Sequence, residues 1–362
     1  MQKLIFTCFL IYILFCCLIA NADDKYGADF LRYLTSAESN GIGKSSVAYS
    51  VGARALNNNP AGLAFSDGNE LIIGSYSTPR ISATIMKENT SEIWEDYGKF
   101  VVEPTEMAYI NYTFPSSKIG NIGISFAFNH EGRFIRVNKE GKATNAFPKD
   151  DFLLGLGYSI KLVNGFAIGF DVKNIRNKVP IDEGSDIGRT WATNIGLIHQ
   201  INDKTKIGVS LQNIGKRLSF KTEDMPDKLR RNLYLGGSYN IIDSKKSKLY
   251  TSFDVNPPFD NGLRYAVGAE FIYADLIAFR LGYIRDIQPY YDMFLNINDY
   301  TSIKESRLWI HKGITMGIGI KLKSADANIA IMPSRNPDLS DDEKLRLDNQ
   351  KPVLSLSFST RF

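Results

Sequence analysis

The chain has 362 residues, of which 44% are hydrophobic and 23% charged, and its formal net charge at pH 7 is +4. These fractions are ordinary for a folded protein, and the length suits one large domain or two modest ones. Because the lysines and arginines are dispersed rather than clustered, the sequence gives no indication of a nucleic-acid partner.

An apolar run near the start predicts a secretory signal peptide. Lys3 precedes the run, which ends in the small-residue site Ala20-Asn21-Ala22. This order predicts a signal peptide over residues 1–22 and a mature chain that starts at residue 23. The run is slightly long for a signal peptide, so an uncleaved membrane anchor is the alternative.

All three cysteines, Cys8, Cys16 and Cys17, lie within this predicted signal peptide. The mature chain would therefore contain no cysteine. Disulfide frameworks, thiol catalysis and thiolate metal sites are excluded from it on that basis.

The next segment, residues 23–68, is rich in Ala, Ser, Gly and Asn and has few large apolar residues with which to build a core of its own. Within it, the stretch "ALNNNPAGLAF" over residues 55–65 predicts a turn followed by a short helix. Asn59 is a favourable N-cap, and Pro60 is favoured at the first helical position.

Most of the remaining chain consists of segments in which large apolar side chains alternate with small or polar ones. In one of them, Ile122 and Ile124 alternate with Gly123 and Ser125. A period of two residues is typical of strands with one apolar face. The predicted strands number fourteen: 69–78, 105–114, 120–129, 152–161, 165–174, 191–199, 205–214, 231–240, 248–255, 263–272, 276–285, 313–322, 326–333 and 353–362.

Both a soluble sandwich and a transmembrane barrel show such alternation. The second face of these strands carries Gly, Ser, Ala and Asn rather than long charged side chains, which suits a crowded polar lumen. Long and short connections alternate, and the strands are close to the roughly 9–11 residues that cross a bilayer at a tilt. The sequence predicts an all-β fold, a 14-stranded antiparallel transmembrane β-barrel over residues 69–362, located in a bacterial cell outer membrane and surrounded by its lipid.

A barrel of this size has a lumen that must be filled or it conducts water. Residues 23–68 are predicted to fill it, because irregular backbone is tolerated at membrane depth when it is shielded from lipid. The chain ends in "PVLSLSFSTRF", and its terminal Phe362 resembles the C-terminal signature of bacterial outer-membrane proteins. We therefore expect Phe362 to be an assembly signal, with the outer-membrane assembly machinery as a partner.

The stretch "SNGIGKSSVAYSVGARALNNNPAGLAF" resembles the N-terminal hatch of the FadL-type family of long-chain fatty-acid transporters and their PorV/PorQ-like relatives. The resemblance implies a fourteen-stranded barrel with residues 23–68 as a hatch inside it. It also implies that Asn59, Pro60 and Ala61 belong to the hatch or gate that separates the lumen from the periplasm. Lys44, Ser45 and Ser46 depart from the usual run of Gly and Met residues, so the ligand does not follow from the resemblance. The matching residues are Gly41, Gly43, Ala48, Tyr49, Asn59, Pro60, Ala61, Gly62 and Leu63.

Little in the sequence indicates catalysis. Only three histidines are present, and they do not combine with Ser and Asp into a recognisable triad; no metal-ligand spacing is found either. The sequence therefore predicts neither an enzyme nor a cofactor or metal site. In "PDLSDDEKLRLDN", Ser340 and Glu343 predict a capping box that opens a short helix rather than a calcium loop.

The longest predicted external loop, residues 286–312, is rich in aromatic and large apolar side chains. Such a patch is typical of a binding surface and is our candidate for capturing a ligand outside the barrel. The alternative is a loop that folds on its own apolar residues and caps the barrel. The candidate residues are Tyr290, Tyr291, Phe294, Leu295 and Trp309.

Together these features predict outer-membrane transport of a hydrophobic small-molecule ligand, fatty-acid-like, through a plugged barrel. Two alternatives stay open. One is a PorV-like interaction or shuttle protein with secreted proteins as partners, and the other is a structural surface protein. The sequence does not decide among the three.

Overall fold

The computed structural model describes residues 26–88, 94–102, 104–116, 119–134, 147–181, 184–221, 227–258, 260, 262–295, 302–334, 336–337, 343–349 and 351–362. The predicted signal peptide, residues 1–22, lies outside the described residues, as does the predicted start of the mature chain.

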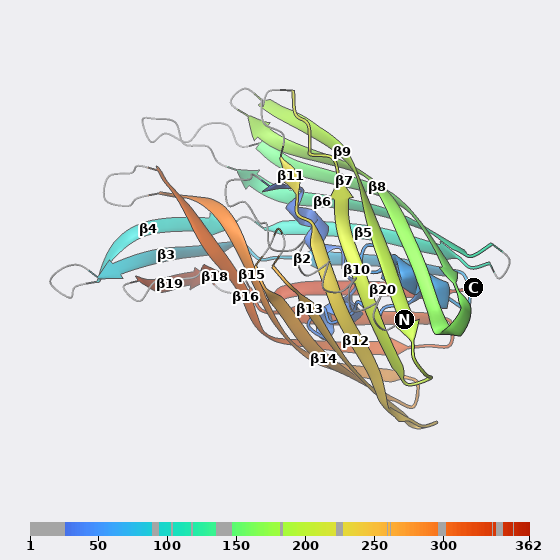
Figure 1. Cartoon of the computed structure of the whole chain (residues 1–362). Coiled ribbons are helices and arrows are strands. Elements are labelled where there is room, and N and C mark those ends of the chain that lie inside the picture. The colour runs from blue at the N-terminus through green and yellow to red at the C-terminus, as the bar shows by residue number, and fades with distance from the viewer. Residues whose placement is uncertain are drawn as a thin grey trace, which may run out of the picture.

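Long antiparallel strands close into a barrel (Figure 1). Each wall strand pairs with the next one along the chain, and the last returns to the first over the register Glu70↔Arg361 to Ser77↔Leu354. The predicted 14-stranded antiparallel barrel is confirmed. The wall strands are β2 (Glu70–Ser77), β5 (Thr105–Phe114), β6 (Asn121–Phe134), β7 (Phe147–Lys161), β8 (Phe166–Ile181), β9 (Gly184–Gln200), β10 (Thr205–Gly215), β12 (Asn232–Asp243), β13 (Ser247–Asn256), β14 (Arg264–Tyr273), β15 (Ile277–Leu295), β16 (Ser302–Lys321), β17 (Ala325–Met332) and β20 (Val353–Arg361).

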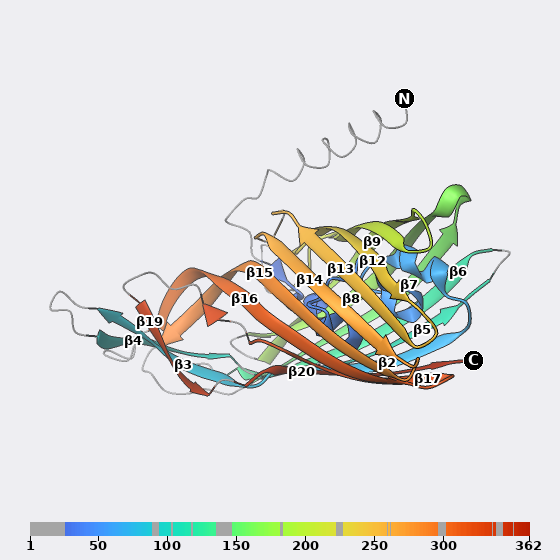
Figure 2. The same ribbon diagram turned by 90° about the horizontal axis from the view of Figure 1, so that it is seen from below.

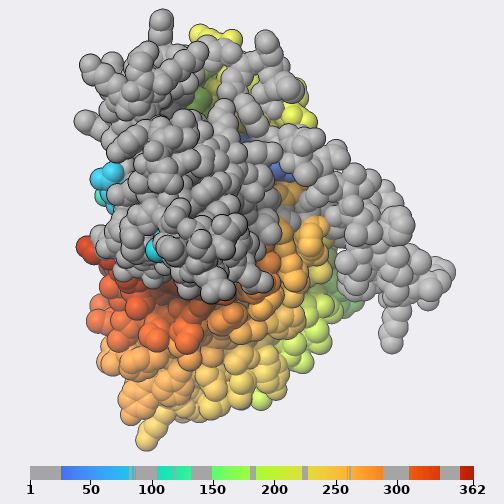
Figure 3. All heavy atoms as spheres, turned by 90° about the vertical axis from the view of Figure 1, so that its left-hand side faces the viewer, coloured from blue at the N-terminus to red at the C-terminus, as the bar shows by residue number. Residues whose placement is uncertain are grey.

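The two ends of the barrel differ. Short turns over 162–165, 201–204 and 244–246 lie at one end, where the backbone N–H of Phe362 also donates to the Asn69 carbonyl at 3.1 Å. We call this the short-turn end and the opposite one the long-connection end. Figure 3 shows β12 to β16, coloured gold to orange-red, packed side by side along one wall.

Several predicted loops at the long-connection end contain paired strands instead. Strands β15 and β16 continue their ladder to Leu295↔Ser302, so the prediction of a loop over 286–312 is wrong for most of its length. Three further strands and one short bridge extend this end beyond the wall (Figure 2). A continued ladder pairs backbone groups that a loop would leave to water. The extra elements are β3 (Ile81–Glu88), β4 (Trp94–Val102), β18 (Asn336–Pro337) and β19 (Glu343–Asn349).

The helix predicted to open at Ser340 and Glu343 is also wrong. Ser340 lies outside the described residues, and Glu343–Asn349 is strand β19, which pairs with β3 from Glu343↔Lys87 onward. Without β19, the edge of β3 opposite β4 would carry unpaired backbone groups, and pairing with that edge outweighs the local capping signal.

The wall strands show the predicted alternation of faces. Along β5, Met107 and Tyr109 point inward and are buried, whereas Ile110 and Phe114 point outward and are 44% and 45% exposed. The outward band is apolar on most strands, as a barrel facing lipid requires. Among the described residues no helix is long and apolar enough to cross a membrane.

Residues 26–68 lie inside the barrel, as the blue segment in Figure 1 shows. We call them the plug. Helix α2 packs on β16, β17 and β20, η2 on β2 and β5, and η3 on β7, β8 and β9, so the plug contacts most of the circumference. Its first element, β1, pairs in parallel with β11 (Lys228–Leu229) near the long-connection end. The plug elements are β1 (Tyr26–Gly27), η1 (Asp29–Tyr33), α2 (Ala37–Gly41), η2 (Gly52–Ala55) and η3 (Pro60–Phe65), and a further short helix, η4 (Val163–Gly165), lies in a turn of the wall.

Candidate functional site

The Asn-Pro-Ala stretch forms the predicted turn and helix. The Asn59 Oδ1 atom accepts a hydrogen bond from the Ala61 N–H at 3.2 Å, and Pro60 occupies the first position of η3. The helix is a 3-10 helix, since the segment is short and its ends are fixed by other contacts. The predicted cap is therefore present.

Asn59 also links separate parts of the molecule. Its Nδ2 atom donates to the Val47 carbonyl at 2.9 Å and lies 3.3 Å and 3.4 Å from the carbonyls of Val209 and Leu197 on the wall. The residue is fully buried. One amide side chain thus ties η3 to another plug segment and to strands β9 and β10.

Glycines in the wall make room for this stretch. A Cβ atom at Gly196 would lie 1.9 Å from Asn59 Oδ1, and one at Gly169 would lie 2.4 Å from the Pro60 carbonyl carbon. The plug backbone can approach the wall this closely only where a side chain is missing. Small residues on the inner face therefore shape the seat of η3.

A group of buried charges joins the plug to the wall. Arg54 of η2 places Nη2 3.0 Å from Glu70 Oε1 and 3.3 Å from Asp326 Oδ2, and its Nε lies 3.7 Å from Glu38 Oε1. Arg361 reaches the same two wall carboxylates at 3.4 Å and 3.3 Å. We call these five residues the charge cluster. They connect α2 and η2 to β2, β17 and β20, so the plug is fixed where the barrel closes.

A second set of contacts continues from Glu38. Asn328 Nδ2 donates to Glu38 Oε1 at 2.8 Å, and Asn328 Oδ1 accepts from Arg280 Nη1 at 2.9 Å. Arg280 in turn pairs with Glu270 at 2.6 Å, and the Tyr49 hydroxyl donates to Glu270. Burial by itself raises the pKa of the Glu38 carboxyl, but the guanidinium groups of Arg54 and Arg280 together lower it to about 2. Glu38 is therefore ionised at neutral pH.

An apolar cluster lies in the lumen on the long-connection side of these charges. Phe30 of η1 is fully buried there, and Tyr33 stacks on Tyr76 with ring centroids 4.8 Å apart. We call this group the lumenal apolar cluster. Its wall residues include Ile72, Tyr76, Met107, Tyr109, Leu153, Ile175, Met332 and Val353. The connection between β10 and β12 adds Leu218, Phe220 and Leu229, and the plug residues are Ala28, Phe30, Tyr33, Leu34 and Ala53.

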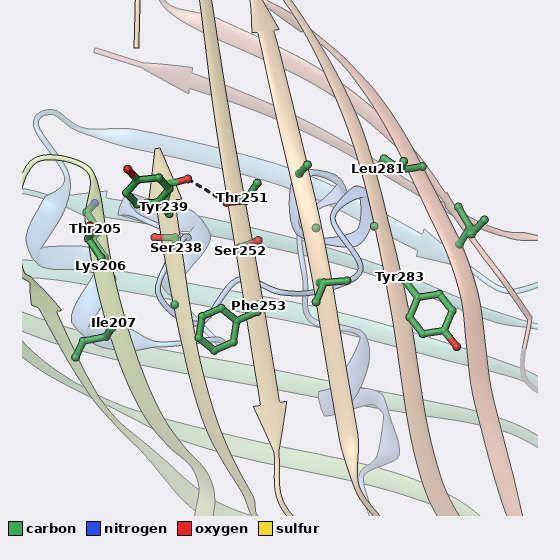
Figure 4. A pocket seen from close by; sticks show the side chains of 16 residues that line it. Thr205, Lys206, Ile207, Ser238, Tyr239, Thr251, Ser252, Phe253, Leu281 and Tyr283 are labelled. Atoms are coloured by element: carbon green, nitrogen blue, oxygen red, sulfur yellow. Dashed lines mark hydrogen bonds between the residues drawn. The ribbon is translucent and has the colours of Figure 1, made fainter. Parts of the chain in front are cut away.

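A concavity lies on the outer face of the wall, across β10 to β16 (Figure 4). It has a volume of about 610 Å³ and is bounded by outward side chains such as Ile207, Phe253 and Leu281. On the inner face of the same strands, a Cβ atom at Gly282 would lie 2.3 Å from the Ile42 carbonyl carbon. At this place one backbone layer separates the plug from the outer surface.

The predicted external capture residues are only partly described. Tyr290, Tyr291, Phe294 and Leu295 are on β15 and Trp309 is on β16, where it faces Gln288 across the ladder. The structure describes the backbone of these residues but not their side chains, so the capture role stays a prediction.

Two further predictions concern Phe362 as an assembly signal and the absence of a metal site. The Phe362 side chain is 75% exposed, and its assembly role also stays a prediction. Within the described residues, no group of three or more His, Cys, Asp or Glu side chains is placed to hold a metal ion.

Sequence reasoning missed both the charge cluster and the lumenal apolar cluster. A signal for the first was present, because Glu70 and Asp326 are charged residues at inward positions of strands whose inner face is otherwise small. A lone charge at such a position, unable to reach solvent, needs a partner from the plug. The apolar cluster had no comparable signal, since many of its members come from residues 28–34 and from the connection between β10 and β12.

No protein-family model matches the sequence, and no curated protein matches it either. Solved structures do match the fold over most of the chain. The toluene transporter TodX of Pseudomonas putida aligns with a TM-score of 0.55 at 15% identity, over 95% of this chain and 100% of its own. A FadL homologue of Pseudomonas aeruginosa gives 0.52 at 12% identity, over 91% and 98% of the two chains. The monoaromatic hydrocarbon channel CymD gives 0.55 at 12% identity, over 91% and 97%. These identities establish likeness of fold, and the resemblance to FadL-type barrels first noted in the plug sequence is confirmed at that level.

Proposed function

We propose that this protein lies in a bacterial outer membrane and passes hydrophobic small molecules, fatty-acid-like or monoaromatic, through its plugged barrel. The observation that carries the proposal is the lumenal apolar cluster. A lumen that conducts ions and polar solutes needs polar walls throughout, whereas this one places aromatic and aliphatic side chains together on the side facing the long connections. The TodX and CymD structures, described as a toluene transporter and a monoaromatic hydrocarbon channel, support it by likeness of fold.

In this proposal the plug itself fills the ligand site when no cargo is present. Phe30 and Leu34 belong to the same buried cluster as apolar wall residues such as Ile175 and Leu153. Contacts among apolar groups are non-directional, so a hydrophobic molecule of similar size can replace them without leaving a polar group unpaired. The polar and ionic contacts of α2, η2 and η3 then stand between this site and the short-turn end.

The proposal also covers how the chain is divided and which residues act as gate. Residues 1–22 are a signal peptide, 23–68 the hatch and 69–362 the barrel, with Asn59, Pro60 and Ala61 at the gate. Supporting the gate role is the burial of Asn59 and its contacts to β9 and β10. No catalytic step is part of the proposal.

The test is binding and flux of toluene and laurate with the purified barrel in liposomes, comparing Ile175→Ser with Ile168→Ser. Both residues are on β8, but Ile175 is buried in the lumenal apolar cluster, whereas Ile168 points outward and is 43% exposed. We expect about tenfold weaker binding for Ile175→Ser only, from the lost apolar contact.

Equal binding and flux in both variants, or none in the unmodified protein, would contradict the proposal. The two alternatives, a shuttle for secreted proteins and a structural surface protein, predict no solute flux in any of these samples. The same assay therefore separates them from transport.

A further inference from the structure

Two cationic side chains lie opposite each other on the outer face of the wall. Arg285 of β15 is the ladder partner of Lys312 on β16. Their chain neighbours Ile284 and His311 are buried on the inner face, so Arg285 and Lys312 point outward, the first half-buried and the second exposed. Like charges directly across a ladder repel each other, and an anion bound between them would remove that repulsion.

No carboxylate among the described residues neutralises this pair. Neither Arg285 nor Lys312 forms an ion pair within that part of the chain. Asp286, the next residue along β15, points into the lumen and lies 3.6 Å from Arg32. The Arg285 guanidinium lies 5.9 Å from the ring centroid of Tyr265. An aromatic ring attracts a cation but brings no net negative charge, so both positive charges remain.

The pair lies at the edge of the apolar band of both strands. Every outward position over 277–283 of β15 and over 314–320 of β16 carries an aliphatic side chain, an aromatic ring or Met. Towards the long connections, the next outward positions are Arg285 and Lys312. Short turns of outer-membrane barrels are periplasmic, and cations at the edge of the apolar band lie at the level of the lipid headgroups. The pair therefore faces the headgroups of the extracellular leaflet.

Short side chains shape the concavity on the outer face of β10 to β16. Thr251 and Ala269 line it and are ladder partners, and the larger Tyr239 and Leu281 flank them on the neighbouring strands. Its volume of about 610 Å³ lies within the range of roughly 300–1,000 Å³ that is typical of ligand sites. The wall thus has an apolar hollow at membrane depth.

The hollow reaches the two cations. Its lining includes Tyr283 and Ile314, which face each other across the ladder and are the outward residues next to Arg285 and Lys312 (Figure 4). The Tyr283 ring lies beside that of Tyr265, with centroids 6.4 Å apart. Cations and tyrosines at one height, with an apolar hollow beside them, match the two parts of a lipid, its headgroup and its acyl chain.

We propose that Arg285 and Lys312 hold the phosphate of an anionic lipid of the extracellular leaflet, with one of its acyl chains in the concavity. The phosphate oxygens accept hydrogen bonds from the guanidinium and the ammonium groups. The charges favour this occupant over a second copy of the barrel, because a two-fold interface through this face would bring four cations together. The inference needs the outer-membrane location but not solute transport.

The test is native mass spectrometry of the full-length barrel, purified in detergent and titrated with dioleoyl phosphatidate or dioleoyl phosphatidylcholine. The two lipids have the same acyl chains, but only phosphatidylcholine carries a cation beside its phosphate. In Arg285→Gln/Lys312→Gln we expect the affinity for phosphatidate to fall about tenfold, the size of effect that a charge-assisted hydrogen bond gives. The affinity for phosphatidylcholine should stay unchanged.

Three further variants serve as controls. Lys245→Gln/Lys246→Gln removes the same charge from an exposed turn at the short-turn end and should change the affinity for neither lipid. Arg285→Lys/Lys312→Arg keeps both charges and should retain phosphatidate binding. Ala269→Phe fills the concavity and should weaken the binding of both lipids.

The opposite results would overturn the assignment. If the affinity for phosphatidate is the same in the Gln variant and the unmodified protein, the headgroup site is refuted. If an equimolar amount of glycerol phosphate displaces phosphatidate, the site takes a free phosphate and not a lipid. If the barrel dimerises in place of lipid binding and Ala269→Phe abolishes the dimer, the face belongs to a second copy. Phosphatidate binding without any flux of toluene or laurate would support this site while rejecting the proposed function.

Discussion

The two ends of the plug are held by different kinds of contact. Towards the long connections, η1 buries Phe30, Tyr33 and Leu34 against apolar wall residues. Towards the short turns, α2, η2 and η3 are held by the charge cluster and by the amide of Asn59. The first set is non-directional and exchangeable. The second is strongly weakened when one of its buried members is removed, because a buried charge or amide then lacks its partner.

This difference indicates that the two sets of contacts have different roles along the lumen. A hydrophobic molecule can replace the apolar contacts near the long connections with little loss of free energy. The polar and ionic contacts towards the short turns keep the plug closed unless several of them break at once. The comparison can be tested by the opening free energy of the plug, measured by hydrogen exchange of its amides in the intact barrel.

The largest effect is expected at the charge cluster. Arg54→Met leaves Glu38, Glu70 and Asp326 without their central cation in a buried place, and the opening free energy should fall by about 3–5 kcal/mol. Hydrogen exchange of the amides of α2 and η2 measures the loss.

The matched control is Arg361→Met, which touches the same wall carboxylates from a side chain that is 50% exposed. Solvent already screens that arginine, so the loss should stay below about 1 kcal/mol. Equal losses of opening free energy in the two variants would mean that this end is held by Arg361 on β20, where the barrel closes, as much as by Arg54 of the plug.

A slightly smaller effect is expected at the apolar end. Phe30→Ala removes a fully buried ring, and the opening free energy of η1 should fall by about 3 kcal/mol. Saturating toluene should partly restore the opening free energy in Phe30→Ala, because an apolar cavity can take up an apolar ligand. It should not restore the opening free energy in Arg54→Met. Phe253→Ala, which removes an outward ring, serves as the control. Failure of toluene to restore protection would argue against an exchangeable site.

A third test weakens the directional end without removing a charge. Asn59→Ala loses the cap of η3 and the link to the Val47 carbonyl, and about 1–2 kcal/mol of opening free energy should go with it. Replacing Asn59-Pro60-Ala61 by three glycines should add backbone freedom and raise uptake of a fluorescent fatty acid while the wall strands stay paired. Asn202→Ala, in an exposed turn, is the control. Unchanged uptake in a barrel shown to transport would reduce the stretch to a structural turn.

Features with a short sequence range were predictable. The wall strands follow from a period of two residues, and the start of η3 follows from Asn59 and Pro60 alone. Even the need for glycine against the plug was visible as small residues on the second face. The strand ends were not, because β15 and β16 extend by pairing with each other rather than by their own pattern.

Features that join distant residues were not predictable. Arg54 meets Asp326 across 272 positions, and Asn328 meets Glu38 across 290. No local periodicity records such a pairing, and only the closed barrel brings β17 and β20 beside η2. The prediction of a helix at Glu343–Asn349 failed for the same reason, because the strand that pairs with this segment, β3, lies far away along the chain.

The smallest effect on the plug is expected at the very end of the chain. Phe362 follows Arg361 directly, yet its side chain is 75% exposed and its backbone adds one hydrogen bond to Asn69. If the charge cluster holds the short-turn end, deletion of Phe362 should change the opening free energy of the plug by less than about 0.5 kcal/mol. The amount of barrel in the outer membrane should nevertheless fall, because we assign this residue to assembly. Quantifying the folded barrel in membranes alongside hydrogen exchange of the purified protein separates the two effects. A loosened plug with normal membrane levels would reverse the assignment and place the chain end among the contacts that hold the gate.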